Sequence, residues 1–158
     1  MFFLGVGGYD NHLLENNIHP QLMAALDSAL TYFYQGLGSL NGADLTASVT
    51  AFTMSDFGRT FTTNGSGTDH GWGAHHLVLG GAVKGGDIYG QYPTVGVDLG
   101  TFANPDGIQS GVWVPTTSVD QYAATLGGWM GASASDLQAI FPNLNNFPSG
   151  ATPGLGFL

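Results

Sequence analysis

Residues 68–76, TDHGWGAHH, place three of the five histidines of this chain and one aspartate on a glycine-rich stretch. Imidazole and carboxylate groups together suit Zn²⁺, Mn²⁺ or iron, whereas shells of oxygen alone suit Mg²⁺ or Ca²⁺. The chain has no cysteine, so a metal ion would be held by His, Asp or Glu. The candidate metal ligands are Asp10, His12, Asp56, Asp69, His70 and His75.

These side chains also have ordinary structural interpretations. Asp10 and Asp56 could each cap a turn, and Asp69 could simply hydrogen-bond His70 to hold a loop. If residues 76–83 form a strand, alternation along its start allows at most one of the adjacent histidines to be a ligand. Six candidates exceed the needs of one tetrahedral zinc ion, and two ions about 3.5–4 Å apart would suit ester hydrolysis.

Arg59 is one of only two cations in the chain and follows Asp56 by three residues, in SDFGRT. The planar guanidinium group suits a phosphate or sulfate oxyanion, so Arg59 is the candidate catalytic residue that would hold an anionic substrate. A salt bridge to a neighbouring aspartate is the equally simple alternative. No G-x-S-x-G sequence is present to supply a serine nucleophile.

The composition excludes several classes of protein. The formal net charge is −9, which leaves no basic surface for nucleic acid or for an anionic membrane. No apolar stretch is long enough to predict a membrane span, and the first residues do not resemble a signal peptide. An acidic, lysine-poor chain without cysteine is typical of a periplasmic or extracellular protein.

The elements that must position these residues follow from apolar spacing. Strands are predicted over residues 2–6 (FFLGV), 48–55 and 76–83. Residues 83–93 are predicted to form a turn-rich segment or a hairpin. Residues 56–74 are expected to form a long loop. Three helices are predicted over residues 19–38, with Pro20 in the first turn, 116–131 and 133–141.

A strand, a helix and another strand in succession indicate a parallel sheet. The predicted fold is a single α/β domain over residues 1–158, with a mainly parallel sheet flanked by helices. The carboxyl ends of neighbouring parallel strands share one edge, so the loops that carry Asp10 and Asp56 would lie side by side. The stretch 68–76 could then fold over the same edge.

Four strings in this order, GGYDNH, FTMSDFGRT, GTDHGWGAHHLVLGGAVKGGDIYGQYP and DQYAATLGGWMG, resemble the C-terminal part of a bacterial family catalogued as domain of unknown function 1501. The resemblance covers nearly the whole chain, and family members carry further sequence before GGYDNH. Many members are exported, and the family is grouped with the alkaline phosphatase and sulfatase superfamily. The resemblance implies an alkaline phosphatase-like fold with Asp and His metal ligands at the carboxyl edge of the sheet.

By similarity, Asp10 with His12, then Asp56, and then Asp69 with His70 would be the metal ligands. The D-x-H spacing of the first pair is shorter than the alkaline phosphatase pattern. Phe57 stands where that superfamily has a histidine ligand. The superfamily nucleophile lies on an early strand that this chain does not contain.

The leading hypothesis is therefore an exported, metal-binding domain that hydrolyses a phosphate or sulfate ester, with zinc favoured over Mn²⁺, Mg²⁺ or Ca²⁺. The alternative is a non-catalytic extracellular protein that binds glycans or assembles into homo-oligomers. Its contacts would come from Trp72, Tyr89, Tyr92 and Trp113, whose rings could stack on sugars or on neighbouring subunits.

Overall fold

The computed structural model of the chain describes residues 1–94, 107–108, 111–147 and 154–158. The chain folds as two compact units. Unit 1 comprises Met1–Leu45, Met54–His75 and Thr94–Val114, and unit 2 comprises Thr46–Thr53, His76–Pro93 and Pro115–Leu158. Each unit therefore contains segments that are far apart in the sequence.

The predicted parallel sheet is wrong. All strands in the described part of the chain pair as antiparallel two-stranded sheets: β1 (Thr50–Phe52) with β4 (Val78–Gly80), β2 (Gly58–Thr63) with β3 (Thr68–Gly71), and β5 (Gly107–Ile108) with β6 (Val112–Trp113). Parallel neighbours need a crossover, usually a helix, and the described residues between β1 and β4 contain none. The alkaline phosphatase-like α/β architecture expected from the resemblance is therefore not the fold of this chain.

The apolar segment 2–6 explains part of this error. It forms no strand, and its side chains are exposed, with Phe2 at 99% and Phe3 at 91%. An apolar run becomes a buried strand only where another strand pairs with it and side chains cover it. Neither occurs here, so the first strand of the predicted βαβ unit is missing.

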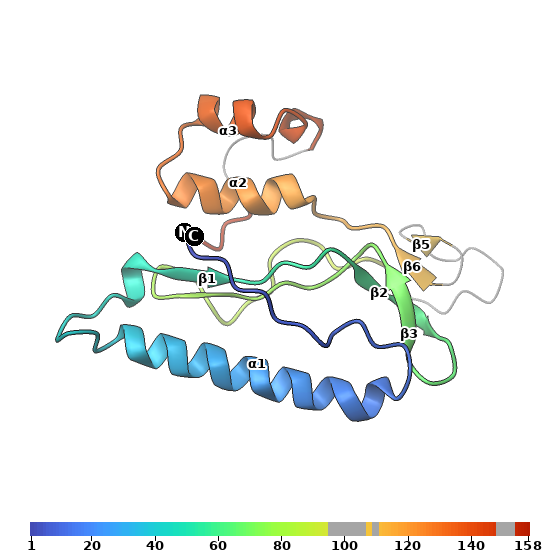
Figure 1. Cartoon of the computed structure of the whole chain (residues 1–158). Helices are drawn as coiled ribbons and strands as arrows, with labels where there is room; N and C mark the ends of the chain where they lie inside the picture. Colours follow the sequence, from blue (N-terminus) through green and yellow to red (C-terminus); the bar gives the residue numbers. More distant parts are fainter. Residues whose placement is uncertain (95–106, 109–110, 148–153) are drawn as a thin grey trace. The chain divides into compact units, whose positions relative to one another are not determined.

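Unit 1 is built around the long helix α1 (Glu15–Leu37). The helix begins four residues before the predicted start, so Pro20 lies inside it and not in its first turn. Its half-buried face repeats at helical spacing through Leu22, Leu26 and Leu30, and only Leu37 is fully buried. The extended N-terminal segment runs alongside, since the Tyr9 hydroxyl donates to the carbonyl of Leu22 at 3.3 Å (Figure 1).

The predicted loop 56–74 instead contains the β2–β3 hairpin of unit 1. Gly58 pairs with Gly71 and Arg59 with His70, and the register shifts between Arg59 and Thr63. The hairpin turn is closed by a main-chain hydrogen bond, in which the N–H of Asn64 donates to the carbonyl of Gly67 at 2.9 Å. The residue pair Asn-Gly at 64–65 is a known hairpin signal.

Unit 2 contains β1, β4 and two short helices, α2 (Val119–Trp129) and α3 (Ala134–Ile140), close to the predicted helices. Each helix begins with a capping box, at Ser118 and at Ser133. The predicted hairpin over residues 83–93 has no strand in the structure. One apolar cluster joins α2 to Phe157, and a second contains Ala124, Leu137 and Leu144.

Candidate metal centre

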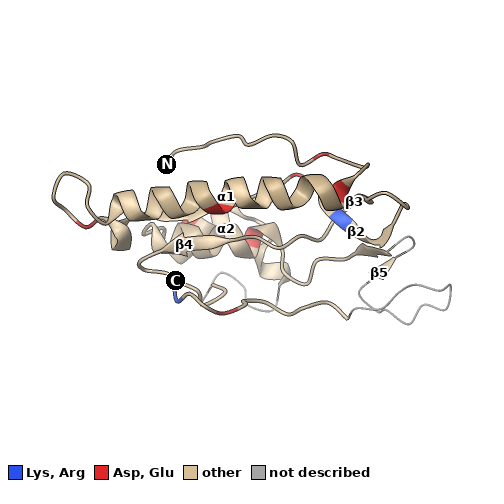
Figure 2. Cartoon of the chain, turned by 90° about the horizontal axis from the view of Figure 1, so that it is seen from below, with Lys and Arg blue, Asp and Glu red and all other residues tan. Residues whose placement is uncertain are grey.

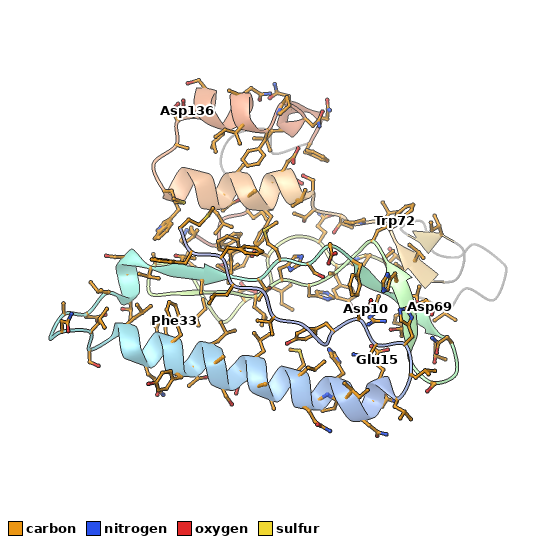
Figure 3. The ribbon with its side chains drawn as sticks, in the orientation of Figure 1. Asp10, Glu15, Phe33, Asp69, Trp72 and Asp136 are labelled. Atoms are coloured by element: carbon orange, nitrogen blue, oxygen red, sulfur yellow. The ribbon has the colours of Figure 1, made fainter. Side chains whose placement is uncertain are left out.

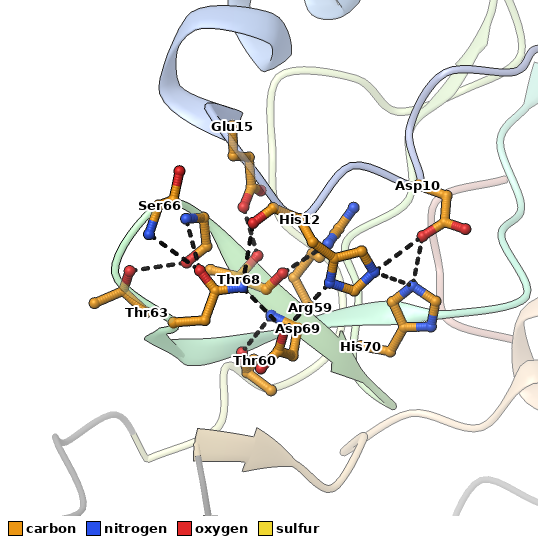
Figure 4. A network of polar contacts seen from close by, with 12 residues as sticks. Asp10, His12, Glu15, Arg59, Thr60, Thr63, Ser66, Thr68, Asp69 and His70 are labelled. Atoms are coloured by element: carbon orange, nitrogen blue, oxygen red, sulfur yellow. Dashed lines mark hydrogen bonds and ion pairs between the residues drawn. The ribbon is translucent and has the colours of Figure 1, made fainter.

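Three side chains of unit 1 converge in the pattern of a metal site. Asp10 and His12 lie on the extended segment before α1, and His70 lies on β3 (Figure 4). The Oδ1 atom of Asp10 is 2.8 Å from Nε2 of His70 and 3.2 Å from Nε2 of His12. The two Nε2 atoms are 3.2 Å apart. We refer to these three residues as the ligand trio.

These distances match the edges of a coordination polyhedron. With bonds of roughly 2.0–2.1 Å, neighbouring ligand atoms lie about 3.3 Å apart around a tetrahedral ion and about 3.0 Å apart around an octahedral one. The trio spans 2.8 to 3.2 Å. An ion bound at all three atoms would therefore require little movement of the side chains.

Asp69 contacts the other nitrogen of His12. Its Oδ1 atom lies 3.2 Å from Nδ1 of His12, and it also accepts a hydrogen bond from Nδ2 of Asn64 at 3.0 Å. An ionised carboxylate can only accept, so a hydrogen bond to Asp69 requires the tautomer of His12 that has its proton on Nδ1. In that tautomer Nε2 keeps a lone pair on the side of Asp10 and His70. A carboxylate behind a histidine ligand is a recurring feature of metal sites.

Neighbouring hydrogen-bond donors lower the pKa of both carboxyl groups at the site. The hydrogen bond from His70 is the main cause that lowers the pKa of Asp10 below its usual value. For Asp69, the hydrogen bond from Asn64 is the first cause of a lowered pKa, followed by that from His12. Both carboxylates are therefore ready to bind a cation at neutral pH.

The site is open to solvent. The side chains of His12 and His70 are 42% and 45% exposed, and that of Asp10 is 65% exposed. Three protein ligands with an exposed remaining face are typical of catalytic metal sites, whereas structural sites are closed by four. Figure 3 shows Asp10, Glu15 and Asp69 at the same end of unit 1, near the start of α1.

Aromatic and polar contacts support His70 from behind. The ring of Phe57 stacks on the imidazole of His70, with centroids 4.0 Å apart and an interplanar angle of 11°. The guanidinium carbon of Arg59 lies 5.4 Å from the centroid of the same phenyl ring. Phe57, just before β2, thus stacks on a histidine of β3.

The remaining candidate residues do not belong to the ligand trio. Among the described residues, Asp56 and His75 are not members of the ligand trio. Asp56 is exposed just before β2, and His75 lies between β3 and β4. The guanidinium group of Arg59 donates to main-chain carbonyls of Thr68, at 2.9 Å, and of Tyr9. Figure 2 colours the charged positions of the described residues and shows a basic one on β2.

Two polar residues of the site were missed in the sequence. Asn64 donates to Asp69 and to the carbonyl of His12, at 3.2 Å for the second bond. Glu15 accepts a hydrogen bond from Thr68 at 2.7 Å, which ties the first turn of α1 to β3. The Asn-Gly pair could have indicated a hairpin that brings Asn64 close to Asp69, but nothing local marks Glu15.

The family described as "Protein of unknown function (DUF1501)" matches residues 1–141 of the chain. The chain belongs to this family. The DUF1501 match contains the ligand trio, Asp69 and Arg59, and it confirms the resemblance seen in the sequence strings. No curated protein and no solved structure matches the chain significantly. The match extends to the DUF1501 family and not to the alkaline phosphatase and sulfatase grouping that the sequence strings implied.

No helix in the described ranges is both long enough and apolar enough to cross a bilayer.

Proposed function

We propose that this DUF1501 domain binds one divalent metal ion through Asp10, His12 and His70, with zinc as the preferred ion. The observation that carries the proposal is the convergence of three potential ligand atoms at 2.8 to 3.2 Å from one another. Two imidazole nitrogens and one carboxylate oxygen suit zinc better than Mg²⁺ or Ca²⁺, which prefer oxygen ligands. The Asp69 carboxylate faces Nδ1 of His12, so Nε2 is the ring nitrogen on the side of the proposed ion.

The proposed chemistry is hydrolysis of a small phosphate or sulfate ester, outside the cytoplasm. The exposed face of the trio leaves room for a water molecule and an ester oxygen. A bound zinc ion would lower the pKa of water and polarise the ester. We propose one metal ion and not the two that six candidate ligands suggested. Among the described residues, the group that could hold an ion contains neither Asp56 nor His75.

The glycan-binding alternative has one supporting observation. Trp72 follows β3 directly, two residues after His70, and is 64% exposed. Trp113 packs edge-on against Phe61 within unit 1, and Tyr89 packs against Phe157 within unit 2. Tyr92, 61% exposed, belongs to unit 2. Trp72 is therefore the residue to test for stacking on a sugar or on an aromatic ester.

The test is metal analysis of protein purified without chelator, followed by zinc titration of chelator-treated protein by calorimetry. The proposal expects one zinc ion per chain and loss of binding in His70→Ala. A screen of phosphate and sulfate esters, with and without added zinc, then tests hydrolysis separately. Failure to bind zinc would overturn the whole proposal. Zinc binding without turnover of any ester would remove only the hydrolase part.

A further inference from the structure

Two side chains of the β2–β3 hairpin grip the segment that carries Asp10 and His12. Arg59 donates from one guanidinium nitrogen to the carbonyl of Tyr9 and from the other to the carbonyl of Thr68 at 2.9 Å. Both bonds are partly buried. Arg59 therefore joins the residue just before Asp10 to the residue just before Asp69.

Asn64 makes a similar connection to the same segment, at the carbonyl three residues after that of Tyr9. Its Nδ2 atom donates to the carbonyl of His12 at 3.2 Å and to Oδ1 of Asp69 at 3.0 Å. Together the two side chains bind the carbonyls of residues 9 and 12, on either side of the Asp10–His12 pair. Each also binds a group on β3, the strand that carries His70.

We propose that Arg59 and Asn64 are positioning residues of the metal centre, which hold Asp10 and His12 against β3 so that the trio is assembled before the ion arrives. This inference rests on the proposed metal binding. We call the two side chains the carbonyl clasps. A preformed site binds more tightly because the ordering of residues 9–12 has already occurred.

The contacts of Arg59 require a side chain with two separate donor nitrogens. The guanidinium group of arginine presents several donors in one plane, so it reaches two carbonyls at once, whereas the ammonium group of lysine acts as a point donor. Arg59 also contacts the ring of Phe57, and Phe57 stacks on His70. These stacked groups orient the imidazole of His70. Arg59 thus acts on ligands from both segments.

The sign of the effect on zinc affinity separates the clasp from other roles of Arg59. If Arg59 acted only through its positive charge, its removal would strengthen the binding of a dication. If it only bound the anionic substrate, its removal would leave zinc affinity unchanged or higher. The clasp alone predicts that zinc binds more weakly when the fork is lost, even when the charge is kept.

The experiment compares Arg59→Lys and Arg59→Gln with wild type, by competition for zinc against a chromophoric chelator. We expect both variants to bind zinc roughly 10–100-fold more weakly, as is typical when groups behind metal ligands are removed. Lys84→Gln is the matched control. Lys84 also donates to main-chain carbonyls, those of Gly156 and Leu158, but in unit 2. It should retain wild-type affinity.

Asn64→Ser tests the second clasp. Asn64 Oδ1 also accepts from the amides of Ser66 and Gly67, and serine can preserve a short acceptor for this turn without the reach of the amide. We expect weaker zinc binding, because the variant no longer donates to the carbonyl of His12 and to the Asp69 carboxylate. Asn16→Ala, at an exposed position in α1, should keep the wild-type zinc affinity.

Hydrogen exchange of residues 9–14 in metal-free protein provides a readout that needs no ion. The clasps predict faster exchange there in Arg59→Lys and Asn64→Ser, with α1 protection retained. Unchanged or tighter zinc binding in folded Arg59→Lys and Asn64→Ser would overturn the inference. If wild type binds no zinc, the proposed function fails, while the exchange data still show whether the clasps hold the segment.

Discussion

The imidazole of His12 stands between two carboxylates, with Nδ1 3.2 Å from Asp69 and Nε2 3.2 Å from Asp10. The two carboxylates are thus on different nitrogens of one ring and have different roles. Asp10 belongs to the ligand trio with His70, and Asp69 orients the ring from behind. This arrangement brings together residues 57 positions apart and is the basis of the predictions below.

Loss of a ligand should abolish metal binding without unfolding the protein. We expect His12→Ala and His70→Ala to lose stoichiometric zinc, because each removes one member of the ligand trio. Equilibrium dialysis followed by elemental analysis measures the bound zinc. His19→Ala is the matched control, since His19 is exposed on α1. Equal loss of zinc in the control would point to nonspecific binding by histidine.

Asp10 and Asp69 should differ in the size of their effects. Asp10→Ala is expected to lose zinc binding as the ligand variants do, whereas Asp69→Ala should weaken it by roughly 10–100-fold. The reason is that the Asp69 carboxylate faces Nδ1 of His12, the ring nitrogen that points away from Asp10 and His70. Calorimetric titration of both variants measures the difference. If Asp69→Ala proved the more damaging, the two roles would have to be exchanged.

Gly58 should tolerate no side chain. A Cβ at this position would lie 1.9 Å from the carbonyl oxygen of Gly73, so Gly58→Ala must push β2 away from the segment after β3. We expect a destabilised unit 1 and weaker zinc binding, measured by denaturant unfolding and by titration. Gly36→Ala is the contrasting variant in α1. Its Cβ meets nothing within 4 Å, and it should stabilise the helix by about 1 kcal/mol.

Leu144 anchors the smaller apolar cluster of unit 2. It is 0% exposed and packs with Ala124 and Leu137, so Leu144→Ala should lower the free energy of unfolding by about 2–5 kcal/mol. Ile140→Ala provides the control, because Ile140 is 62% exposed at the end of α3. Urea denaturation followed by circular dichroism measures both. A similar loss in the two variants would contradict the assignment of Leu144 to the core.

The capping box of α3 should make the free energy of unfolding decrease as the pH falls into the acid range. The hydroxyl of Ser133, and then its main-chain amide, lower the pKa of Asp136 below its usual value of 3.8. Because the pKa is lower in the folded state, the ionised carboxylate stabilises the fold above the unfolded-state pKa, and this contribution is lost as the pH falls through the folded-state pKa. Denaturant unfolding at a series of pH values should show Asp136→Asn less stable than wild type at neutral pH. The difference should vanish in acid, and a constant difference would contradict this cause.

The sequence alone determined the types of the chemical groups and the local helices. Composition required a metal to be held by His and carboxylate, and the spacing of apolar residues predicted α1, α2 and α3 to within a few residues. Asp10, His12 and His70 were among the candidates for the same reason, as metal-competent side chains are recognisable by type. These features depend on each residue and its near neighbours, which are what a sequence records directly.

Only the tertiary structure decided which candidates meet and how the strands pair. The strand pairings and the exposed 2–6 segment depend on contacts between distant residues, which apolar content does not specify. Likewise, the His12–Asp69 bond and the grip of Arg59 on Tyr9 exist because the β2–β3 hairpin folds against the segment before α1. Direction and distance arise from the packing of these segments, so the sequence could suggest the ligands but not their separate roles.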